Sequence, residues 1–141
     1  MKSLLVKSGV ILIGLAIFGY AEVWGADWKY YGENNDGKLF YDANSVTRPS
    51  KDIVRVWTKL LYSEKGKIDT AKKFKKKEFE NLSEALSLYE FHCGHNEGRF
   101  LSLSFNSKDG KVLYFADNSS GIWGHIFPGD KQEPLYKILC K

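Results

Sequence analysis

Two cysteines and three histidines are the residues of this chain whose types could bind a metal or support nucleophilic catalysis. Cys93 and His95 lie two positions apart with His92 beside them, but a closed zinc site needs four ligands and this cluster supplies three. No serine is accompanied by a histidine and a carboxylate at a spacing typical of a catalytic set, and no phosphate-binding motif occurs. The sequence therefore predicts no enzyme, no metal site and no cofactor.

The start of the chain is typical of a secretory signal peptide. A short positive segment precedes an apolar run over residues 9–19, and Val23 and Gly25 supply the small-residue pattern that signal peptidase requires. The apolar run is shorter than the roughly 20 residues that cross a bilayer. We therefore expect a signal peptide over residues 1–25, a single exported domain over residues 26–141, and no membrane segment after cleavage.

Export decides how the two cysteines are interpreted. Exported chains are oxidised, so Cys93 and Cys140 are predicted to form one disulfide. Closing the long loop between them would stabilise the fold by about 4 kcal/mol. The alternative is a metal site built on Cys93, His92 and His95, which is short of ligands.

One candidate binding region is a lysine-rich stretch within residues 64–81. Its candidate binding residues are Lys72, Lys73, Lys75, Lys76 and Lys77. The stretch forms either a long hairpin loop or a short amphipathic helix. Phe74 and Phe79 lie in it without a clean helical spacing, which favours a mobile, solvated excursion. Such a cluster could bind an acidic partner; the alternative is a loop kept soluble by its charges.

A second candidate binding patch is one face of the predicted strand over residues 53–63. Arg55, Trp57 and Lys59 alternate along it with Val54, Val56, Thr58, Leu60 and Tyr62, which form the better core face. For Trp57, as for Trp28 and Trp123, packing in the core is the alternative to a recognition surface.

Period-two alternation predicts six strands. They cover residues 28–33, 38–42, 53–63, 84–93, 99–107 and 112–118. A short C-terminal helix follows, with Asp130 as its N-cap and Glu133 at the capping-box position. Leu135, Ile138 and Leu139 form its apolar stripe. The predicted fold is α+β: a six-stranded antiparallel sheet with the helix packed on one face and tethered by the disulfide.

Six segments, in this order, carry a resemblance to a known family. They are Trp28-Lys29-Tyr30-Tyr31-Gly32, Tyr41-Asp42, Val54-x-Val56-Trp57-x-Lys59, Leu88-Tyr89-Glu90-Phe91-x-Cys93, Trp123-x-x-Ile126-x-Pro128-Gly129 and Leu135-Tyr136-Lys137-Ile138-x-Cys140. Together with the two cysteine positions they resemble the surface-adhesin protein E family of Gram-negative bacteria. The resemblance implies an antiparallel sheet bridged to a C-terminal helix, and binding of host matrix and plasma proteins at the cell surface.

These observations lead to a non-catalytic binding module of the periplasm or cell surface that holds an extracellular protein or an anionic glycan. The alternative is a periplasmic structural or accessory protein of the envelope with no ligand, self-associating through an edge strand. A monomer or a weak homo-oligomer is expected. The net charge of +4 is mild and does not indicate a nucleic-acid partner.

Overall fold

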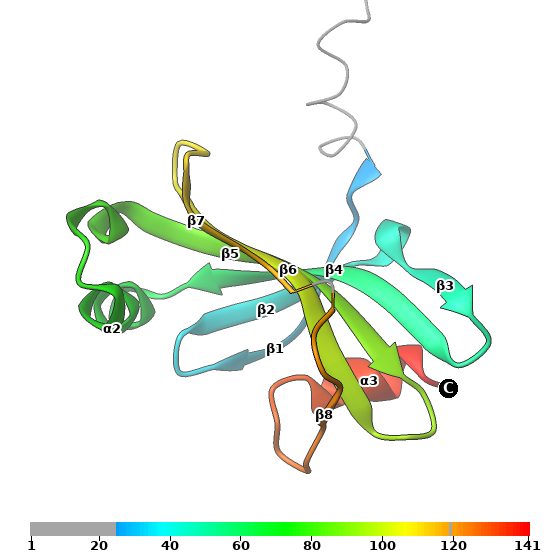
Figure 1. The fold of residues 1–141 in the computed structure, drawn as a ribbon. Coiled ribbons are helices and arrows are strands. Elements are labelled where there is room, and N and C mark those ends of the chain that lie inside the picture. The colour runs from blue at the N-terminus through cyan, green and yellow to red at the C-terminus, as the bar shows by residue number, and fades with distance from the viewer. Residues whose placement is uncertain (1–24, 119) are drawn as a thin grey trace, which may run out of the picture.

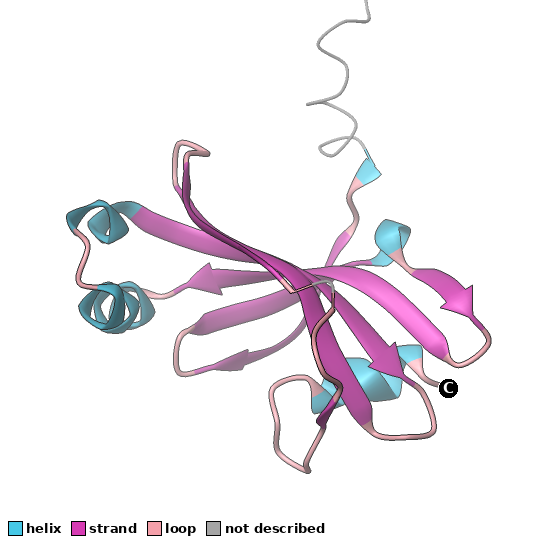
Figure 2. Cartoon of the chain, in the orientation of Figure 1, coloured by secondary structure: helices cyan, strands magenta, loops and turns pink. Residues whose placement is uncertain are grey.

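The computed structural model describes residues 25–118 and 120–141. In this part of the chain eight strands form one antiparallel sheet (Figures 1 and 2). They are β1 (Trp28–Asn34), β2 (Gly37–Asp42), β3 (Thr47–Ser50), β4 (Ile53–Tyr62), β5 (Leu82–His92), β6 (Glu97–Ser107), β7 (Val112–Asp117) and β8 (Gly124–His125). The main order is β1-β2-β4-β5-β6-β7, with β3 beside β4 and β8 beside β6.

The six predicted strands are confirmed, with ends that differ by a few residues. The short strands β3 and β8 were not predicted. Pro49 lies within β3. There it removes one hydrogen-bond donor from a short segment, which a strand at the margin of a sheet tolerates.

Two helices lie on the same face of the sheet, which we name the helix face. They are α2 (Glu64–Phe74) and α3 (Glu133–Leu139), and Figure 1 shows them apart, α2 at the left end of the sheet and α3 at the lower right. The 3-10 turn η2 (Lys77–Asn81) continues from α2, and a further 3-10 turn, η1 (Ala43–Ser45), links β2 to β3. No α-helix of the described residues covers the other face, which we name the open face.

The core lies on the helix face in two clusters. Near α3, Val54 and Val56 are fully buried against Phe91 and Leu135. Near α2, a second cluster gathers around Phe79, which is also fully buried. The predicted core face of β4 is therefore confirmed, since alternate residues of one strand reach both clusters.

Residues 64–81 do not form the solvated excursion that the sequence predicted. The Ser63 hydroxyl accepts a hydrogen bond from the Gly66 amide and caps α2, and Lys75 ends the helix in the left-handed region with φ 56°. This turn redirects the chain, so that the Phe74 and Phe79 rings stack at 4.4 Å although their spacing is not helical. The helix was disfavoured because the spacing of the two rings was compared with that of one continuous helix, whereas α2 ends at Phe74 and Phe79 lies beyond the turn.

Helix α3 begins at Glu133, and the predicted N-cap at Asp130 is wrong. The Asp130 carboxylate accepts a hydrogen bond from the Phe127 amide, and the Glu133 carboxylate accepts one from the Gly129 amide, so both stabilise the preceding turn. Leu135 and Leu139 are buried as predicted. Ile138 is 39 % exposed, because only the row of side chains formed by Leu135 and Leu139 faces the core along this short helix.

The predicted disulfide between Cys93 and Cys140 is confirmed, with Cα atoms 5.3 Å apart. It is one of several contacts that hold α3. The Tyr136 hydroxyl accepts hydrogen bonds from the Gly94 and Asn96 amides, and Arg48 donates to the Leu139 carbonyl at 2.8 Å. These contacts hold α3 at its C-terminal end and at Tyr136.

The predicted signal peptide lies outside the described residues, apart from Gly25. Among the residues that are described, no helix is long and apolar enough to span a membrane.

Candidate ligand-binding surfaces

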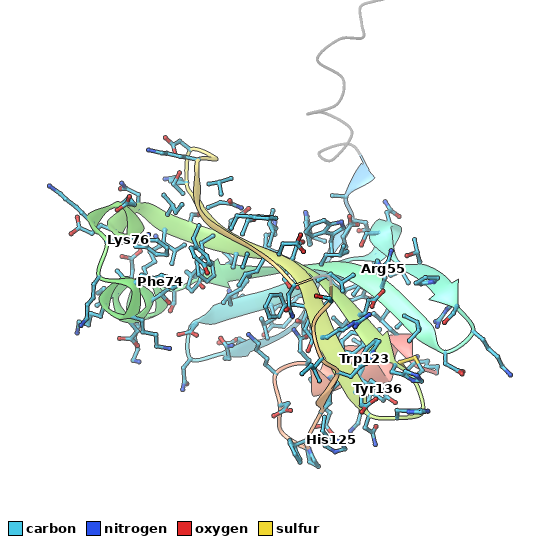
Figure 3. The ribbon with its side chains drawn as sticks, viewed as in Figure 1. Arg55, Phe74, Lys76, Trp123, His125 and Tyr136 are labelled. Atoms are coloured by element: carbon cyan, nitrogen blue, oxygen red, sulfur yellow. A yellow bond between two sulfur atoms is a disulfide. The ribbon has the colours of Figure 1, made fainter. Side chains whose placement is uncertain are left out.

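The residues singled out from the sequence do not form one site. Arg55, Trp57 and Lys59 project from β4 on the open face, whereas the predicted lysines belong to α2 and the turn after it. Figure 3 shows Arg55 and Lys76 well apart, toward opposite ends of the molecule. Each group must therefore be judged separately.

Arg55 is occupied by an internal carboxylate. Its Nε and Nη2 atoms donate to one oxygen of Glu90 at 2.9 and 2.7 Å, and Glu90 is only 3 % exposed. Arg99 donates to the other oxygen of Glu90 at 3.2 and 3.1 Å and to the Gly121 carbonyl at 2.7 Å. A buried carboxylate requires such partners, so the main role of Arg55 is to neutralise Glu90.

The tryptophans line the open face rather than the core. Trp57 is 39 % exposed, so the core-packing alternative is wrong for this residue. Trp28 is half-buried beneath the Lys59 ammonium, which lies 4.4 Å from its ring centroid. Trp123 is likewise half-buried and stacks on the Arg99 guanidinium at 4.3 Å. Two of the three rings are thus used in internal cation–π contacts, which leaves Trp57 as the accessible one.

The α2 lysines differ in whether they have a partner. Lys65 pairs with Asp69 at 2.8 Å, which lowers the pKa of that carboxyl, and Lys67 pairs with Glu64 at 3.1 Å. For the five predicted lysines, no ion pair is formed within the described part of the chain. Their charges are therefore available to a ligand.

Four of these five lysines surround one hollow, which we name the lysine hollow. It has a volume of about 450 Å³. It is lined by Glu64, Lys67, Ile68, Ala71, Lys72, Lys75, Lys76, Lys77 and Glu80. Lys73 is absent from this lining and faces the other side of α2. The structure thus brings together Lys72, Lys75, Lys76 and Lys77 and separates Lys73 from them.

The histidines make contacts but no metal centre. His92 and His95 stack with ring centroids 3.8 Å apart, and His92 meets the edge of Trp123 at 5.5 Å. In the described residues, no three histidine, cysteine, aspartate or glutamate side chains gather closely enough to bind a metal ion.

Sequence reasoning missed Glu90 and Arg99. Glu90 is a charged residue inside an otherwise apolar segment, and that signal could have drawn attention to it. Its partners follow only from strand register, since Glu90 lies opposite Arg55 on one side and Arg99 on the other.

Comparison with known proteins adds one finding. The sequence model of surface-adhesin protein E matches residues 28–141. No curated protein sequence and no solved structure matches the chain. The family match implies a binding role rather than catalysis and a location outside the cell or at its surface. Because the match covers every described strand and helix from β1 onward and includes both disulfide cysteines, this protein belongs to the surface-adhesin protein E family.

Proposed function

We propose that this protein is a non-catalytic binding module of the bacterial periplasm or cell surface that holds an anionic glycan at the lysine hollow. The observation that carries the proposal is the gathering of Lys72, Lys75, Lys76 and Lys77 around one concave surface, where none of them forms an ion pair with a described residue. Unpaired cations in a hollow raise the local concentration of an anionic ligand.

The form of the hollow favours a polymer of repeated charges over a single small anion. The four named lysines are exposed, and each presents a single charge on a flexible side chain. An arginine would instead offer a rigid, planar set of hydrogen-bond donors suited to one small anion. Glu64 and Glu80 also line the hollow, and they disfavour anions placed near them. A sulfated polysaccharide can place successive charges beside the lysines and leave gaps opposite the glutamates.

The same charges give the alternative of an acidic extracellular protein. Such a partner would need apolar contacts at its centre, and the hollow offers only Ile68 and Ala71 among its apolar side chains. The glycan is therefore the better match to this surface.

Retention on immobilised heparin tests the proposal. We expect the protein to be retained at low ionic strength and released as salt approaches about 0.2 M, because exposed charges are screened over about 8 Å near 0.15 M. The double substitution Lys72→Gln with Lys76→Gln should weaken binding about two- to thirtyfold, since exposed pairs contribute roughly 0.2–1 kcal/mol each.

The matched control removes the same charge from lysines outside the hollow. Lys73→Gln with Lys131→Gln leaves the lysine hollow intact and should change heparin affinity less than twofold. No retention at low salt would refute the proposal. So would an equal loss in both double variants, because binding would then depend on net charge alone.

A second candidate function, self-association in the envelope, is favoured by edge strand β7. Val112 and Phe115 of β7 are 57 % and 61 % exposed. Exposed apolar residues on an edge strand can pair with a second copy. Light scattering over a range of protein concentrations would detect this association, and Phe115→Lys should abolish it.

A further inference from the structure

A second concave surface, which we name the sheet groove, crosses the helix face between the two core clusters. It has a volume of about 450 Å³, within the range of roughly 300–1,000 Å³ typical of small-molecule sites. Thr70 and Phe74 of α2 form one wall, and Gln132 beside α3 forms the other. Figure 3 shows Phe74 on α2, at the end of the sheet away from α3 and Tyr136.

The floor of the sheet groove is mainly apolar. Side chains from four strands contribute to it, among them Leu39, Leu60, Ala85, Leu103 and Phe105. These residues belong to, or pack against, the two core clusters, so the floor is held rigidly. A hydrophobic ligand lying on this floor would be removed from water, at a gain of about 25 cal/mol per Å² of apolar surface.

Tyrosine hydroxyls are placed around this floor. Burial raises the pKa of Tyr31, Tyr62 and Tyr89, that of Tyr62 to about 12, so all three hydroxyls remain neutral at physiological pH. Tyr31 donates to the Gln132 side chain at 2.8 Å, which joins β1 to the α3 wall.

The Tyr89 hydroxyl makes no hydrogen bond to another described residue and can donate one to a ligand. Burial is the main cause of its raised pKa, and the nearby Asp130 carboxylate raises that pKa further. The Tyr89 ring lies over Gly98, where a Cβ atom would come within 2.7 Å of the ring.

The rim of the sheet groove is cationic. Lys73 contributes from α2 and Lys131 from the segment before α3; both are exposed, and neither forms an ion pair with a described residue. Asp36 is the acid among the described lining residues. Its carbonyl oxygen accepts a hydrogen bond from the Ser63 amide at 2.8 Å, which places it at the N-terminal end of α2.

We propose that the sheet groove binds an anionic amphiphile, an alkyl chain of medium length carrying one anionic head group. The chain lies on the apolar floor, and the head group lies between Lys73 and Lys131 with the Tyr89 hydroxyl as a donor. Charge complementarity excludes a cationic head group. The apolar floor excludes a fully polar ligand such as a free sugar, which would leave it without contacts. This site is independent of the lysine hollow, because different lysines serve the two.

Calorimetric titration of the purified, oxidised full chain tests the proposal. Sodium dodecanoate, kept below its micelle concentration, should bind saturably with one molecule per chain. Dodecyltrimethylammonium, which has the same chain and the opposite charge, should bind at least tenfold more weakly. Lys73→Gln with Lys131→Gln should weaken dodecanoate binding about two- to thirtyfold, and Lys72→Gln with Lys76→Gln should change it less than twofold.

A floor-filling variant supplies a second test. Ser87 lies half-buried in the floor, and Ser87→Phe should abolish dodecanoate binding; if this variant does not fold, the lysine variants still decide. Equal binding of the two detergents, equal loss in the two lysine double variants, or unchanged binding by folded Ser87→Phe would each overturn the proposal. Heparin retention depends on the other pair of lysines, so failure of one proposal is separable from failure of the other.

Discussion

Replacing both cysteines by serine is expected to lower the free energy of unfolding by about 4 kcal/mol. The two residues are 47 positions apart, and the entropy of closing a loop of that length in the unfolded chain gives this figure. Typical domains are stable by about 5–15 kcal/mol, so the loss is large but the variant should still fold. With a urea dependence of about 1.3 kcal/mol per molar, the unfolding midpoint should fall by about 3 M.

The contacts of α3 determine how the Cys93→Ser, Cys140→Ser variant loses this stability. Leu135 has no exposed surface and packs in the same cluster as Val54 and Val56. Detaching α3 would therefore open the core, so we expect the helix to stay docked while the folded variant persists. Leu135→Ala should then cost about 2–5 kcal/mol both with and without the disulfide.

Urea unfolding, followed by far-ultraviolet circular dichroism and by tryptophan fluorescence, measures all four members of this cycle. Trypsin cleavage after Lys137, an exposed residue of α3, reports separately on release of the helix under native conditions. The reasoning is refuted if cleavage at Lys137 becomes rapid in the cysteine-free variant while the sheet signal is retained. It is also refuted if Leu135→Ala has no added effect in that variant, because the disulfide alone would then hold α3.

Three further predictions concern other parts of the structure. Glu90→Gln should cost about 2–4 kcal/mol in urea unfolding because two arginines lose their carboxylate, whereas Glu97→Gln at the surface should cost less than about 0.5 kcal/mol. Stability should decline above pH 10, because the raised pKa of Tyr62 favours its neutral form in the folded state and this contribution is lost as pH rises from 10 toward 12. The urea midpoint of the Tyr62→Phe variant should fall less steeply with pH over that range than the midpoint of the unsubstituted protein. An equally steep fall in the two proteins would contradict the assignment to Tyr62. Gly66→Ala should destabilise the docking of α2, since a Cβ atom would lie 2.0 Å from the Asp36 carbonyl oxygen; unchanged amide exchange in α2 would show that the backbone relaxes freely.

Local patterns predicted the sheet well. Val54, Val56 and Thr58 alternate with exposed or charged neighbours, and in a strand that period alone decides which side is buried. The cysteines were paired correctly because an oxidised chain with two thiols allows one bridge.

Features that depend on tertiary placement were not predicted. Phe74 and Phe79 stack because Lys75 adopts a left-handed conformation. No residue type in that segment predicts this conformation. The sequence singled out the lysines, but it did not show that adjacent Lys72 and Lys73 serve different surfaces. Their separation follows from how α2 packs on the sheet.

The position of α3 in the chain also constrains the order of folding. Ribosomal synthesis proceeds from the N-terminus, yet Val54 and Val56 are covered by Leu135 and Leu139, near the C-terminal end. The hairpins of β4, β5 and β6 join neighbouring segments and can form early, at low cost in loop entropy. Until α3 docks, the apolar side of these strands remains exposed to water. A nascent chain would then present an incomplete sheet that is prone to aggregation. We therefore expect the slowest folding phase to be the docking of α3, and a holdase chaperone to recognise the sheet before that step.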